Sequence, residues 1–153
     1  MLLNKKYYGS RLDNLKRRNM LMESVIAVGA TGSGVAGWAV WQTEQGALVW
    51  AVISGVSILL AVIKPFLKLV DRIENYGKLF GEYAKAYVSL KFLVEDLQVR
   101  RVVSDEDIKI FVQIRNRAAE LISLDDPNPD PRFVRTLQQE VNTEIPINQL
   151  WVP

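Results

Sequence analysis

The chain has 153 residues, a length typical of one domain, and contains neither cysteine nor histidine. This composition excludes a thiol nucleophile, a disulfide framework, a Cys/His zinc site and a histidine base near neutral pH. No set of nucleophile, base and stabilising group can be assembled from the remaining residues. We therefore expect a protein that is not an enzyme and that uses no cofactor or metal. The net charge of +2 is too small to indicate nucleic-acid binding.

The first segment, residues 1–22, is basic, with six lysines and arginines against one acid. Tyr8, Leu12 and Leu15 could form the apolar stripe of a short amphipathic helix at a membrane surface. A frayed basic leader is the alternative. A cleavable signal peptide is disfavoured, because no small-residue cleavage site ends the following apolar run and a second apolar run comes at once.

Residues 24–41 and 47–63 carry no charge, and each can cross a bilayer as a helix. The link between them has five residues, which predicts a two-span hairpin over residues 23–63. Tryptophans 38, 41 and 50 lie near this link, as expected of an interfacial aromatic belt. Basic residues flank the hairpin on both sides and are absent from the link. The positive-inside rule therefore places both termini in the cytoplasm.

Small residues recur at intervals of four in both predicted spans. In lipid, helices associate through close backbone contact, since there is little hydrophobic drive between them. The pattern predicts tight packing within the hairpin or between subunits around a shared pore, and it does not separate these alternatives. The residues concerned are Gly29, Ser33, Gly34, Gly37, Ala51 and Gly55.

An apolar seam follows the second span, with a 3-4 spacing typical of heptad positions a and d. It comprises Phe66, Leu69, Ile73, Tyr76, Phe80, Tyr83, Tyr87, Leu90, Val94 and Leu97. The seam predicts that the second span continues into a long cytoplasmic helix that joins subunits or a helical bundle. Its bulky central aromatic residues favour a bundle wider than two strands, with residues 108–122 covering part of the seam.

Pro65 lies at the predicted membrane exit and is expected to act as a hinge. A kink within a continuous helix is preferred over a break, because the seam keeps its phase across the proline. Residues 64–153 are expected to form a cytoplasmic helical domain. Within it, Ser104 is predicted to cap one helix, and Asp130 with Pro131 to begin another.

Four arginines near the expected helix junctions are candidate contacts for an anionic ligand: Arg100, Arg101, Arg115 and Arg117. Ordinary surface arginines are the alternative interpretation. The expected fold is thus an all-α membrane protein, with a transmembrane hairpin, a long cytoplasmic helix and C-terminal helices packed as a bundle.

The basic leader, the two-span hairpin and the stretch LLAVIKPFLKLVDRIENYGKLFGEYAKAYVSL resemble the SLATT family of small bacterial membrane proteins. The resemblance extends from about Leu12 to Leu97. It implies a multi-pass protein of the bacterial inner membrane and an effector in antiphage or conflict systems. It also implies a nucleotide or oligonucleotide signal and, as a partner, the nucleotidyltransferase that makes that signal.

The first functional hypothesis is an oligomeric membrane effector that forms a pore or disrupts the inner membrane when a cytoplasmic signal arrives. Its partners would be the lipid bilayer and further copies of the chain. A membrane anchor or scaffold that recruits a cytoplasmic partner through the heptad helix is the alternative. A soluble protein with a buried apolar hairpin is a third and poorer hypothesis, since so small a core would have to bury two uncharged runs.

Overall fold

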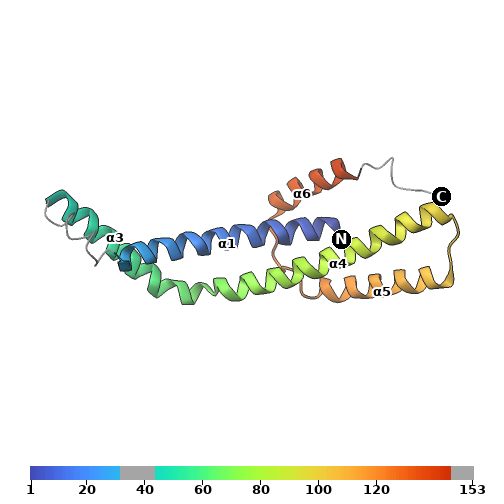
Figure 1. Ribbon diagram of the computed structural model, residues 1–153, viewed down its shortest axis with the longest axis horizontal. Helices are drawn as coiled ribbons and strands as arrows, with labels where there is room; N and C mark the ends of the chain where they lie inside the picture. Colours follow the sequence, from blue (N-terminus) through green and yellow to red (C-terminus); the bar gives the residue numbers. More distant parts are fainter. Residues whose placement is uncertain (32–43, 146–153) are drawn as a thin grey trace. The chain divides into compact units, whose positions relative to one another are not determined.

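The computed structural model describes residues 1–31 and 44–145, and every regular element within them is helical (Figure 1). These elements are α1 (Leu2–Thr31), α3 (Glu44–Ile63), the 3-10 helix η1 (Lys64–Leu67), α4 (Leu69–Arg100), α5 (Asp105–Ile122) and α6 (Pro131–Glu144). The all-helical part of the prediction is confirmed. Among the described residues, one stretch, Gln45–Leu67, is long and apolar enough to cross a membrane.

The chain divides into two compact units. The first unit comprises Met1–Leu12 and Asn75–Pro153, and the second unit is Asp13–Glu74. The predicted boundaries at residues 22 and 63 differ from these, because the first turns of α1 belong with the helices that follow residue 75. Neither an interfacial helix nor a frayed leader describes residues 2–12, since they form the start of a 30-residue helix that packs within the first unit.

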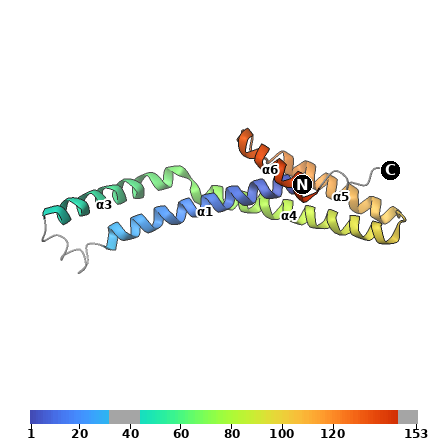
Figure 2. The same ribbon diagram turned by 90° about the horizontal axis from the view of Figure 1, so that it is seen from above.

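The first unit has a core built by four helices. In both views α4 and α5 run side by side, joined by residues 101–104 (Figures 1 and 2). Lys6 of α1 pairs with Glu144 of α6 at 2.7 Å, so α6 lies against the first turns of α1. The buried residues of this core come from all four helices and are Tyr7, Tyr8, Leu79, Tyr83, Leu121 and Leu137.

Local sequence signals begin the two C-terminal helices, as predicted. Ser104 caps α5 in a capping box, in which its side chain accepts from the Asp107 N–H and the Asp107 side chain accepts from the Ser104 N–H. Asp130 accepts hydrogen bonds from the N–H groups of Arg132 and Phe133, with Pro131 at the first helical position of α6. Both capping predictions are confirmed.

The helix is interrupted at the proline, so the expectation of one continuous kinked helix is wrong. The α-helix α3 ends at Ile63, η1 holds Pro65, and Lys68 has a left-handed φ of 46° before α4 begins. Proline has no N–H for the Ala61 carbonyl, and its ring clashes with the preceding turn. The Lys68 N–H instead bonds the Pro65 carbonyl at 3.3 Å, which closes a tighter turn.

This break removes Phe66 from the seam. Its side chain is 80% exposed and lies on η1, which precedes α4. From Leu69 to Leu90 the predicted seam residues are buried or half-buried on α4, whereas Val94 beyond them is exposed.

In the second unit, the later turns of α1 lie beside α3. The Ser57 hydroxyl is 2.9 Å from the Val25 carbonyl and 2.8 Å from the Ile53 carbonyl of its own helix. A Cβ added at Gly29 would lie 2.0 Å from Ser57 Oγ, so only glycine fits at that position. Lys64 pairs with Glu23 at 2.7 Å. These contacts hold the two helices close together.

The other predicted packing residues of the spans have different surroundings. A Cβ added at Gly55 would meet nothing within 4 Å, and Ala51 is exposed. Ser33, Gly34 and Gly37 lie outside the described residues.

Candidate functional site

The N-terminal segment, residues 2–12 of α1, covers the aromatic part of the α4 seam. The Tyr8 ring stacks on the Tyr83 ring with centroids 5.7 Å apart, and meets the Tyr76 ring edge-on at 5.5 Å. A Cβ at Gly9 would lie 3.1 Å from the Phe80 ring, so the helices approach closely there. Residues 2–12 of the same chain therefore cover this part of the seam.

A group of hydrogen bonds links this segment to the turn between α5 and α6. Asp125 Oδ1 accepts from the Tyr8 hydroxyl at 2.9 Å and from the Tyr83 hydroxyl at 2.8 Å. Asp125 Oδ2 also accepts from the Asn4 amide at 3.3 Å. One carboxylate thus joins α1, α4 and the turn, and its three donors offset the removal of its charge from water.

The neighbouring aspartate makes a second connection. The Tyr7 hydroxyl donates to Asp126 Oδ2 at 2.6 Å, and the Asp126 N–H donates to the Tyr8 hydroxyl at 2.8 Å. Arg11 Nε donates to the Tyr7 hydroxyl at 3.3 Å. We call Tyr7, Tyr8, Tyr83, Asp125 and Asp126 the tyrosine–aspartate cluster. Tyr8 is 2% exposed and Tyr83 is 1% exposed, so this cluster lies at the centre of the first unit.

The surroundings of the cluster shift its pKa values in a consistent way. Burial raises the pKa of the Tyr83 hydroxyl to about 12, and burial also raises the pKa of Tyr8 and of Tyr7. The hydrogen bond from Tyr7 holds the pKa of Asp126 below its ordinary value. Neutral phenols and an ionised carboxylate are therefore the stable forms at neutral pH, and these are the forms that bind one another.

The stability of the first unit should consequently fall at both extremes of pH. A tyrosine whose pKa is raised on folding stabilises the fold below its unfolded pKa of about 10, and this contribution is lost as the pH rises towards 12. Asp126 has a lowered pKa, so its contribution is present above about pH 4 and is lost on further acidification. Thermal unfolding followed by circular dichroism should show both losses.

Two variants that each remove one tyrosine hydroxyl test this pH dependence, the second as a control. Tyr7→Phe should weaken the acid-side dependence, since the hydrogen bond that lowers the pKa of Asp126 is gone. Tyr87→Phe should leave the loss of stability at acid and at alkaline pH unchanged, because the Tyr87 hydroxyl makes no hydrogen bond with a described residue. Its ring lies under Lys5 Nζ at 5.0 Å. Equal pH profiles for wild type and Tyr7→Phe would contradict the assignment.

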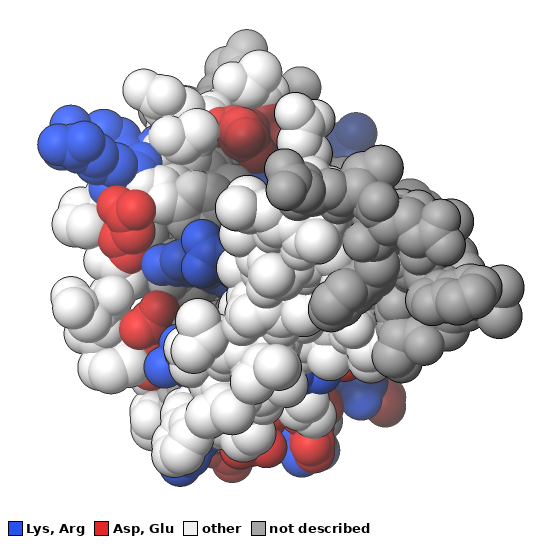
Figure 3. All heavy atoms as spheres, turned by 90° about the vertical axis from the view of Figure 1, so that its left-hand side faces the viewer, with Lys and Arg blue, Asp and Glu red and all other residues white. Residues whose placement is uncertain are grey.

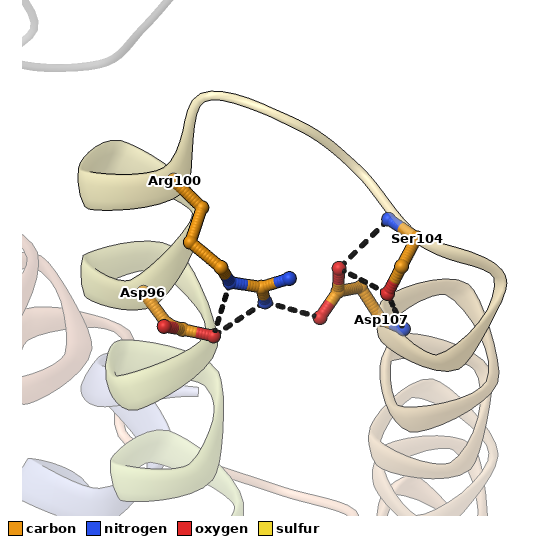
Figure 4. Close-up of polar contacts among 4 residues, drawn as sticks. All are labelled: Asp96, Arg100, Ser104 and Asp107. Atoms are coloured by element: carbon orange, nitrogen blue, oxygen red, sulfur yellow. Dashed lines mark hydrogen bonds and ion pairs between the residues drawn. The ribbon is translucent and has the colours of Figure 1, made fainter.

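The candidate anion-binding arginines are not gathered at one place. Arg100 donates to Asp96 and, at 2.8 Å, to Asp107, which is 5% exposed and held by Ser104 (Figure 4). Arg117 pairs with Glu82 at 2.7 Å. Since Glu82 and Arg100 are eighteen residues apart on α4, these two sites are separated by roughly 27 Å of helix.

Carboxylates therefore already neutralise Arg100 and Arg117, and the arrangement in Figure 4 fastens the corner between α4 and α5. Arg101 and Arg115 are exposed and make no ion pair with a described residue. Among residues 1–31 and 44–145, no group of three acidic side chains is placed to hold a metal ion.

The role of the N-terminal segment was missed by the sequence analysis, which considered only a membrane surface or solvent for it. The pair Tyr7–Tyr8 and the pair Asp125–Asp126 were the available signals, since phenols and carboxylates form strong hydrogen bonds when both are buried. Comparisons with protein-family models, with curated proteins and with solved structures find no match to this chain. The candidate site is accordingly defined by its geometry: a polar and aromatic joint that fixes α1 on α4.

Proposed function

We propose that this chain is a helical protein of the membrane, inserted through α3. The observation that supports this proposal is the exposure of α3. Only 6% of its apolar stretch is buried within the chain, and Leu48, Val52, Ile58, Leu59 and Val62 are all more than half exposed. At about 25 cal/mol per Å² of apolar surface, such a helix is unfavourable in water and favourable in lipid. Figure 3 faces the left-hand side of Figure 1, and the described atoms in the middle of this view are mostly neither Lys, Arg, Asp nor Glu.

The two parts of the chain that form the first unit support a two-span topology. Met1–Leu12 and Asn75–Pro153 form one compact unit, which favours a location for both on the same side of a membrane. If α3 crosses the bilayer, the chain must cross once more between these parts. The uncharged residues 24–41 are the only other stretch able to do so. Lysines and arginines before residue 19 and after residue 63 favour the cytoplasm for that side, by the positive-inside rule.

Within this class, we propose an oligomeric effector of the bacterial inner membrane that opens or disrupts the bilayer on a cytoplasmic signal. The resemblance of residues 12–97 to the SLATT family, which rests on the sequence pattern alone, suggests this activity and a nucleotide as the signal. Uncharged spans would line a narrow apolar pore that opens by wetting, because they provide no charged selectivity filter. The open surface at Gly55 leaves room for a second copy of α3.

Dye release from vesicles tests the effector proposal against the scaffold. The full chain, reconstituted into phosphatidylethanolamine and phosphatidylglycerol vesicles without a signal, should retain carboxyfluorescein at low protein-to-lipid ratios and release it at high ratios, where crowding in the membrane drives assembly. Release should rise more steeply than in proportion to the protein-to-lipid ratio, because several copies form one pore. A scaffold would insert equally well and release no dye at any ratio. That result, with insertion verified by flotation, would contradict the proposal.

A further inference from the structure

One face of α4 carries both the predicted oligomer seam and the docked N-terminal segment. Tyr76 and Tyr83 contact Tyr8, Phe80 contacts Gly9, and Tyr87 lies under Lys5. A second copy of α4 cannot reach these four side chains while residues 2–12 lie on them. The closed first unit and a seam-to-seam assembly are therefore mutually exclusive.

We propose that residues 2–12 are an autoinhibitory segment, which covers the α4 seam until its displacement allows the seams of several copies to assemble. This inference rests on the proposed function and names the regulation of its assembly. The closed state is the one in which the tyrosine–aspartate cluster is complete. The open state exposes Tyr76, Phe80, Tyr83 and Tyr87 to the same residues of other copies.

The chemistry of the contact suits a reversible joint. The segment is held by hydroxyl and amide donors on two carboxylates, by ring contacts with α4 and α6, by an ion pair at the surface and by the burial of its own apolar side chains. Those buried side chains are Leu2, Tyr7, Tyr8 and Leu12. Each such hydrogen bond contributes modestly in net terms, since water replaces it when the joint opens. When the segment leaves, the aromatic rings of α4 become exposed to water. The seam of a second copy can bury them again, so assembly offsets the loss of buried surface.

The segment is also connected to the proposed membrane region. It occupies the first turns of α1, which is one uninterrupted helix from Leu2 to Thr31. The later turns of α1 contact α3 through Gly29 and Ser57. Residues 2–12 and the residues that pack against α3 therefore belong to the same helix.

A covalent lock tests this inference. The chain has no cysteine, so Lys6→Cys with Glu144→Cys introduces a unique pair outside the seam, and a short bismaleimide can join it because the Lys6 Nζ lies 2.7 Å from Glu144 Oε2. Gly9→Leu is the release variant, since even a Cβ there meets the Phe80 ring at 3.1 Å. Gly77→Leu is its matched control, because a Cβ at Gly77 meets nothing within 4 Å.

In the cysteine-pair background, Gly9→Leu should lower the cross-linking yield several-fold, raise the mass in detergent from monomer to oligomer, and increase dye release. Gly77→Leu should match the parent. Cross-linking before reconstitution should keep the protein monomeric and abolish the increase in dye release, whereas a monofunctional maleimide should not. Tyr8→Phe, which removes two hydrogen bonds and keeps the ring, provides a milder release variant.

Three results would overturn the inference. The first is a fall in the cross-linking yield of Gly9→Leu without any change in its mass in detergent. The second is an unchanged yield in both Gly9→Leu and Tyr8→Phe, which would show that the segment does not leave. The third is assembly of the cross-linked protein to the same extent as its monofunctional control. If masses respond as expected and no variant releases dye, the autoinhibitory role stands and the effector proposal fails.

Discussion

Replacing Tyr83 with alanine is expected to lower the free energy of unfolding of the first unit by about 3–5 kcal/mol. Tyr83 is 1% exposed, stacks on Tyr8 and donates to Asp125, so its loss opens a cavity and removes one of the donors to a carboxylate. Denaturant unfolding of the full chain in mild detergent, followed by circular dichroism, measures the change.

Phe92→Ala is the matched control for this substitution. It removes an aromatic ring of similar size from the same helix, but Phe92 is 65% exposed. The expected change is within about 0.5 kcal/mol, as for most exposed positions. Equal destabilisation by the two substitutions would show that the tyrosine–aspartate cluster is not the core of the first unit.

Two arginines in the middle of α3 are expected to prevent stable membrane insertion. Val52→Arg combined with Val56→Arg places both charges near the centre of the stretch Gln45–Leu67. Each arginine is unfavourable by about 2.5–3.5 kcal/mol at the centre of a span. After a carbonate wash, wild type should remain in the membrane pellet, whereas the double variant, which keeps only residues 24–41 as a span, should appear in part in the supernatant.

The control for insertion uses the same chemical change at another site. Val99→Arg on α4 also replaces an exposed valine, and Val99 is 83% exposed within the first unit. This variant should stay in the pellet like wild type. Retention of the α3 double variant as complete as that of wild type would indicate that α3 does not need lipid, and would favour a protein that covers this helix with another partner.

Local sequence rules predicted several elements correctly. Ser104, Asp130 and Pro131 begin their helices as expected, because capping depends on residues only two or three positions away. The predicted seam residues from Leu69 to Leu90 are buried or half-buried on α4, and a periodic pattern indicates which face of a helix is removed from water. These features need no knowledge of distant contacts.

Features that depend on distant residues were not predictable in the same way. Periodicity shows that a face is covered without showing what covers it, so the sequence analysis assigned the seam to other copies or to residues 108–122 and missed residues 2–12. The pairing of Arg117 with Glu82 likewise joins residues 35 positions apart. At Pro65, a seam that stayed in phase favoured a kink, yet loss of the N–H and steric clash ended the helix.

The most direct test of the account is the side of the membrane on which three positions lie. Single cysteines at Ser10, Gln45 and Ser123 are unique labels in this cysteine-free chain. In intact cells, an impermeant maleimide should label Gln45→Cys alone, and permeabilisation should add Ser10→Cys and Ser123→Cys. Labelling of Ser10→Cys and Ser123→Cys from opposite sides, or protection of Gln45→Cys until the cells are opened, would contradict the two-span account.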